Sequence, residues 1–129
     1  MVELVVWLRA QLDEDERIAR AATAGPWTQS GIGEYGWGVS FSVPGAGVEA
    51  DDSDQGRADA DHIAEHDPAR VLREIDAKRL AIDHYQRIFQ HAVDGADSYV
   101  RIAAALSRQI QIMASVYADR PGYRQSWRP

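Results

Sequence analysis

The chain has 129 residues, of which 45% are hydrophobic and 26% are charged, so it is long enough to bury a core. It contains no cysteine, which excludes disulfides, thiolate zinc sites and cysteine nucleophiles. The net charge of −6 is uneven, because residues 98–129 carry +4 and residues 1–97 therefore carry −10. This acidic body disfavours nucleic acid as a partner, since affinity for nucleic acid comes mainly from neutralising phosphates.

The N-terminus lacks the basic region of a secretory signal peptide. No apolar run approaches the length of a membrane span. We therefore expect a single domain over residues 1–129 in the cytoplasm, with no membrane contact and with residues 118–129 as a C-terminal tail.

Residues 2–23 are predicted to form an amphipathic helix, because their apolar residues recur every three or four positions. The acidic run 13–16 interrupts this stripe and is interpreted as a solvated turn. Gly25-Pro26 ends the helix, since proline cannot continue it and glycine tolerates the cap geometry.

From residue 27 the apolar period changes to two, which is typical of strands with one buried face. The predicted strands are Trp27–Ile32, Tyr35–Val43 and Val48–Asp51, which form a small antiparallel meander. Three short strands need a helix over their apolar face to be stable.

Three helices follow the predicted sheet. A short helix covers about residues 57–66, and Asp67-Pro68 then starts a second helix, because aspartate favours the N-cap and proline the first helical position. The second helix runs to about residue 93 and the last one covers about 98–117. The expected fold is α+β: an N-terminal helix, a small three-stranded antiparallel meander, two long C-terminal helices and a short tail.

The segment His62-Ile-Ala-Glu-His66 matches the H-x-x-E-H pattern of inverted zinc peptidases, in which Glu65 would be the base. Asp67-Pro68 breaks the helix at the second histidine, and the only later glutamate, Glu74, is too close to be a distant third ligand. We therefore favour an architectural role for the histidine pair. We expect no cofactor, and His62 and His66 remain only weak candidates for a metal site.

Two further groups of residues are candidates for binding. A pocket between sheet and helices would take a small anionic molecule, because aromatic rings stack on it and histidine and arginine meet its charge. Its candidate lining residues are Trp27, Trp37, His62, His66 and Arg70. In the tail, an exposed Trp127 beside arginines would make a contact patch for a protein partner. The residues of this patch are Tyr123, Arg124, Trp127 and Arg128.

Four blocks of the chain together resemble a family of small proteins of unknown function found in actinobacteria and their phages. The blocks are 8–16, Ala21-Ala-Thr-Ala-Gly-Pro-Trp27, Ala60-Asp-His-Ile-Ala-Glu-His-Asp-Pro-Ala-Arg-Val-Leu72 and 117–129. The resemblance implies an origin and a fold but no activity. It also implies that arginine replaces Glu65 in relatives, which weakens the peptidase interpretation, and that the paired cysteines of many relatives are absent from Ala92–Arg108.

The preferred hypothesis is a non-enzymatic accessory protein of phage or prophage type that acts by binding a protein partner. The long helices carry enough apolar positions for a homodimer through a helix bundle. One alternative is a protein that sequesters a small molecule or nucleotide signal. A second alternative is a metal-dependent hydrolase that uses His62 and His66.

Overall fold

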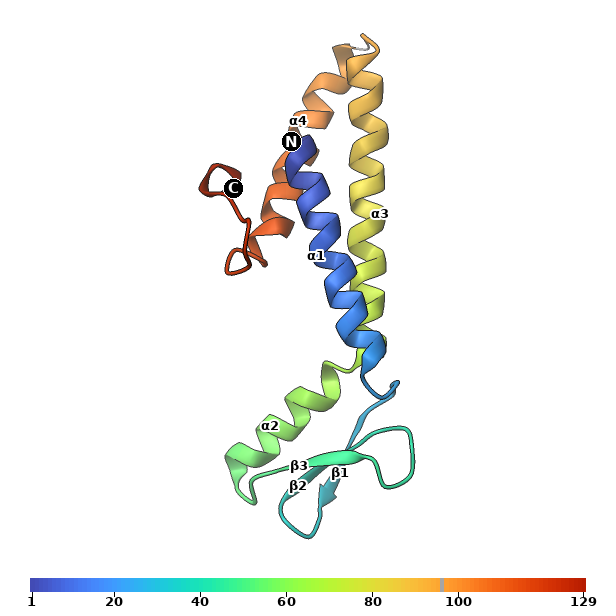
Figure 1. Ribbon diagram of the computed structural model, residues 1–129, viewed down its shortest axis with the longest axis vertical. Coiled ribbons are helices and arrows are strands. Elements are labelled where there is room, and N and C mark those ends of the chain that lie inside the picture. The colour runs from blue at the N-terminus through green and yellow to red at the C-terminus, as the bar shows by residue number, and fades with distance from the viewer. Residues whose placement is uncertain (96) are drawn as a thin grey trace. The chain divides into compact units, whose positions relative to one another are not determined.

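The computed structural model describes residues 1–95 and 97–129 (Figure 1). Its elements are α1 (Val2–Ala21), β1 (Thr28–Ile32), β2 (Trp37–Ser40), β3 (Gly47–Ala50), α2 (Asp54–Glu65), α3 (Pro68–Val93), α4 (Asp97–Ser115) and a short 3-10 helix, η1 (Gln125–Trp127). The predicted α+β fold is confirmed: an N-terminal helix, a three-stranded antiparallel sheet, two long helices and a short tail. In the parts of the chain that the structure describes, no helix is long and apolar enough to cross a membrane.

The chain forms two compact units. The helical unit consists of residues 1–14 and 75–129, and the sheet unit consists of residues 15–74. Helices α1 and α3 each contribute residues to both units. Each unit has a core of its own.

Helix α1 is continuous through the acidic run 13–16, so the predicted turn there is wrong. The acidic side chains are accommodated because they pair with arginines. Asp13 accepts a hydrogen bond from Arg79 at 2.8 Å, and Glu16 lies 3.3 Å from Arg20, one helical turn later. A glutamate paired with an arginine four residues later, as Glu16 is with Arg20, stabilises the helix rather than breaking it.

The core of the helical unit is built from a leucine stripe on α1. Leu4, Leu8 and Leu12 are four residues apart and fully buried, together with Ile82 of α3 and Ile110 of α4. Side chains four residues apart lie on one face of a helix, which explains why all three leucines point into the core.

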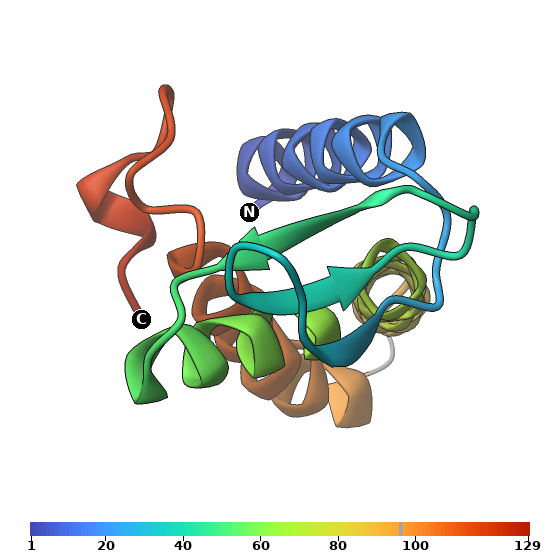
Figure 2. The same ribbon diagram turned by 90° about the horizontal axis from the view of Figure 1, so that it is seen from below.

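The sheet has the order β1-β2-β3, and both neighbouring pairs are antiparallel. Helix α2 contacts all three strands and runs along the sheet (Figure 2). Val39 in the central strand is the largest fully buried side chain of this unit. The register between β1 and β2 shifts between Gln29 and Gly31, where a φ of 86° at Gly31 permits the bulge.

Candidate functional site

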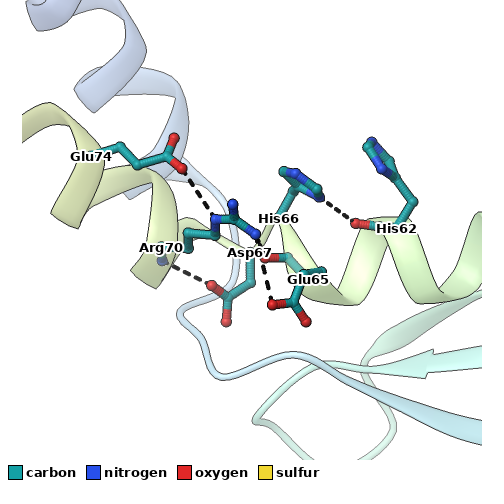
Figure 3. A network of polar contacts seen from close by, with 6 residues as sticks. All are labelled: His62, Glu65, His66, Asp67, Arg70 and Glu74. Carbon is teal, nitrogen blue, oxygen red and sulfur yellow. Dashed lines mark hydrogen bonds and ion pairs between the residues drawn. The ribbon is translucent and has the colours of Figure 1, made fainter.

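The junction between α2 and α3 is held by one carboxylate. Asp67 Oδ1 accepts a hydrogen bond from the backbone N–H of Arg70 at 2.9 Å, which caps α3 (Figure 3), and Oδ2 accepts one from the N–H of Trp27 at 3.0 Å. The Arg70 bond, the Trp27 bond and the nearby Arg73 charge lower the pKa of Asp67 from its ordinary value of 3.8, although burial acts in the opposite direction. Asp67 therefore joins two segments that are 40 residues apart in the sequence.

His62 and His66 lie side by side at the end of α2, with ring centroids 4.2 Å apart. The Nδ1–H of His66 donates a hydrogen bond to the carbonyl oxygen of His62 at 2.8 Å (Figure 3). The backbone N–H of His66 also donates to the carbonyl oxygens of His62 and Ile63, so His66 caps the C-terminal end of α2 with both its backbone and its ring. Among the described residues, no group of three or more His, Cys, Asp or Glu side chains is arranged to hold a metal.

The charge of Arg70 is shared by two glutamates. Its Nε donates to Glu74 at 3.1 Å, and its guanidinium also lies 3.7 Å from the carboxylate of Glu65 (Figure 3). An anionic ligand would have to compete with both carboxylates. Likewise, Glu65 would have to break its ion pair with Arg70 before it could act as a catalytic base.

Trp27 and His66 meet at a shallow hollow of about 330 Å³ in the sheet unit. The hollow is lined by Asp15, Ile18, Ala19, Ala22, Trp27, His66, Pro68 and Val71. Trp27 stacks on Phe41 with ring centroids 4.0 Å apart, and its indole N–H donates to the carbonyl of Thr23 at 2.9 Å. The polar atom of this ring is thus already satisfied, so the hollow is chiefly an apolar surface.

Trp37 does not line this hollow. It lies at the end of β2 opposite to the end that pairs with Thr28, and the guanidinium of Arg57 packs 5.0 Å from its ring centroid. The structure therefore brings Trp27, His66 and His62 together, places Arg70 next to them in ion pairs, and puts Trp37 elsewhere in the sheet unit.

Within the helical unit, the tail packs on α1 through aromatic rings. The ring of Trp7 on α1 lies 5.6 Å from Tyr123 and 5.4 Å from Trp127, and its indole N–H donates to Pro121 at 3.1 Å. Trp127 is buried, so the exposed ring that a tail contact patch requires is missing. Arg124 pairs with Glu3. Arg128 remains exposed.

An exposed apolar surface of the helical unit lies on α3 and α4. A groove of about 350 Å³ runs between them and is lined by Ala81, His84, Tyr85, Leu106, Gln109, Ile110, Ile112 and Met113. Tyr85, one of these lining residues, is buried, and this burial raises the pKa of its hydroxyl. Beside the groove, Leu80 is 67% exposed and Val116 is 65% exposed, and Ile102 is exposed as well. We call this surface, with its groove and these three residues, the α3/α4 face.

The apolar positions of the two long helices predicted a homodimer through a helix bundle, but they did not locate the α3/α4 face, although the sequence of α4 carries a signal for it. The apolar residues of α4 occupy more of the helix circumference than one buried stripe needs. Ile102, Ala105, Ile112 and Val116, with Gln109 between them, are spaced alternately by three and four residues, and all five are exposed. A second apolar stripe of this spacing is typical of a helix that packs on two sides.

Comparison with known proteins identifies the family alone. No curated protein and no solved structure matches the chain. The family of unknown function DUF6221 matches residues 1–129, the whole of the sequence, and the chain therefore belongs to this family.

Proposed function

We propose that the protein is a non-enzymatic accessory protein, of actinobacterial or phage origin, that binds a protein partner in the cytoplasm. The origin follows the resemblance of four blocks of the sequence to small proteins of actinobacteria and their phages. The binding role follows the distribution of apolar surface.

The α3/α4 face carries this proposal. Leu80, Ile102, Ile112 and Val116 leave between 45% and 67% of their surface exposed beside an apolar groove. Soluble proteins that stay alone seldom expose large apolar side chains as a contiguous group, whereas binding surfaces do. The groove between two helices also suits the apolar side of a partner helix.

The experiment is a comparison of captures from lysate of an actinobacterial host. The bait is the full chain, either unchanged or with Leu80→Asp and Ile112→Asp together. We expect at least one protein to be retained by the unchanged chain and lost with the double variant, because two carboxylates on the α3/α4 face oppose burial in an interface. Quantitative mass spectrometry of the eluates measures the difference.

Val43→Asp is the matched control, because Val43 is an exposed valine of the sheet unit, outside the α3/α4 face. It should retain the same protein as the unchanged chain. Circular dichroism should show equal helix content in all three baits. If the double variant folds and captures the same proteins at the same levels, the α3/α4 face is not the binding surface.

A second candidate function is small-molecule binding at the hollow of the sheet unit. Its lining by Trp27, Ile18 and Val71 favours a neutral, apolar ligand over the expected anion, and Arg70 is already paired with two glutamates. Native mass spectrometry of the protein purified without chelator tests this idea. A mass excess that disappears in Ala22→Trp, a change that fills the hollow, would favour this function over protein binding.

A further inference from the structure

Arginines border the α3/α4 face on both helices. Arg87 follows the groove residue His84 by three positions and so lies on the same side of α3. On α4, Arg108 precedes Ile112 by four positions and follows Arg101 by seven, so both arginines flank the exposed apolar stripe.

These three guanidinium groups are available to a partner. All three are exposed, and within residues 1–95 and 97–129 none has an ion pair or a side-chain hydrogen bond. Other arginines of the helical unit are engaged, because Arg9 pairs with Asp83 at 2.7 Å and Arg79 with Asp13 at 2.8 Å. The basic rim therefore stands out within a chain whose net charge is −6.

We infer that the α3/α4 face binds an amphipathic helix whose apolar stripe is flanked by aspartate and glutamate. This inference rests on the protein-binding function proposed above and adds the chemistry of the partner. An α-helix is about 10 Å wide, so a helix in the groove has its two flanks next to the two rims. Arginine at the rim then meets carboxylates, which steers the encounter and fixes the orientation of the partner.

The charges also suggest how such a helix lies. α3 and α4 run antiparallel, because Tyr85 and Phe89 of α3 share one hollow with Val100 and Ser107 of α4, while the earlier residue Ala81 meets Met113. Arg87 and Arg101 thus mark the end of the groove nearer the α3–α4 connection. Asp76, four residues before Leu80, places a carboxylate at the opposite end of the groove. The acidic flanks of the partner should concentrate at the basic end.

A second copy of the chain fits this face less well. Asp97 is the only acidic residue of α4, whereas Arg101 and Arg108 lie along its exposed side. Two copies packed through α4 would bring arginines of like charge together without carboxylates to separate them, which opposes association.

The test uses two fluorescein-labelled helical peptides of roughly 18 residues, long enough to run along α4. Both carry leucine at every third or fourth position, and the flanking positions are glutamate in one peptide and lysine in the other. We expect the full chain to bind the glutamate peptide in fluorescence anisotropy and to bind the lysine peptide at least about tenfold more weakly. Affinity for the glutamate peptide should fall as salt is raised.

Arg101→Glu with Arg108→Glu should weaken binding of the glutamate peptide about tenfold and improve binding of the lysine peptide. Arg128→Glu is the matched control, because Arg128 is exposed but lies in the tail, and it should change neither affinity. Leu80→Asp with Ile112→Asp should abolish binding of both peptides.

The results separate the partner chemistry from the proposed function. If both peptides bind equally and only the apolar variant loses them, the groove binds helices but the acidic preference is refuted. If neither peptide binds and sedimentation shows a dimer that Ile112→Asp dissociates, the occupant is a second copy and the inference is wrong. If neither peptide binds and the protein stays monomeric, both the inference and the face on which the proposed function rests are overturned.

Discussion

At the scale of single residues, Asp67 has a role that only a carboxylate can fill. Its two oxygens accept hydrogen bonds from two backbone N–H groups, those of Arg70 and Trp27. Asparagine offers one acceptor oxygen and one NH₂ group, so one backbone donor would face another donor. Serine or threonine would reach one of the two donors at most.

We predict that Asp67→Asn lowers the free energy of unfolding at pH 7 by about 1–2 kcal/mol, the loss typical of a helix cap and one buried hydrogen bond. Because the folded state lowers the pKa of Asp67, its contribution is full above the ordinary value of 3.8 and is lost as the pH falls through the lower folded pKa. Urea unfolding from pH 7 to pH 2.5 should therefore show the difference between the two proteins begin to shrink once the pH falls below about 4.

The matched control is Asp76→Asn, an exposed aspartate on the same helix, which should change stability by less than about 0.5 kcal/mol. An equal loss in both variants, or a difference for Asp67→Asn that is as large at pH 2.5 as at pH 7, would show that the paired acceptor is not the source of the stability.

At the scale of elements, the tail depends on one glycine. Gly122 has a φ of 90°, and a Cβ there would lie 2.7 Å from the indole nitrogen of Trp7. The Gly122→Ala variant combines a left-handed backbone, which costs about 1–2 kcal/mol for an L-residue, with a clash against the ring that holds the tail. We predict that amides of residues 122–128 exchange faster in this variant, measured by hydrogen exchange with mass spectrometry.

Gly45→Ala supplies the comparison, because Gly45 has a similar φ of 80° and nothing within 4 Å of its Cβ position. It should leave exchange in the tail unchanged. Unchanged exchange in the Gly122→Ala variant would mean that the contact with Trp7 does not control tail docking.

The order and type of the elements were predictable from the sequence, for local reasons. Apolar spacing distinguished helices from strands, and Asp67-Pro68 located the start of α3 to the residue. The acidic run 13–16 continues α1 instead of forming the predicted turn: the pair of Glu16 with Arg20 is local and visible in the sequence, whereas the pair of Asp13 with Arg79, 66 residues away, is not.

The candidate sites were less predictable, because they depend on which segments meet. The pairing of β1 with β2 separates Trp37 from Trp27, and the ring of Trp7 buries Trp127. Residue types alone predict neither this strand pairing nor the burial of Trp127. The α3/α4 face was visible only as an excess of apolar residues on α4, and deciding which of them stay exposed requires the tertiary structure.

At the scale of the whole molecule, the two units have cores of different size. The helical unit buries six large side chains almost completely, namely Leu4, Leu8, Leu12, Ile75, Ile82 and Ile110, whereas the sheet unit buries Val39 to this degree. Local stability follows buried apolar contacts. We predict that amides of β1–β3 and α2 exchange through openings of lower free energy than amides of residues 4–12 and 75–85.

Native-state hydrogen exchange at increasing urea measures these opening energies directly. The prediction requires the strand amides to exchange before denaturant reaches the global transition. Equal opening energies in both units would instead indicate one cooperative structure despite the difference between the cores.

The division of the chain also has a consequence for synthesis on the ribosome. The sheet unit is contiguous, so all of its residues have been added once residue 74 is in place. The helical unit joins residues 1–14 to residues 75–129, and its leucine stripe must wait for Ile82 and Ile110. Since contiguous segments can fold while the chain grows, the nascent protein should acquire its sheet first, while the apolar side of α1 still lacks its partners and is open to chaperones.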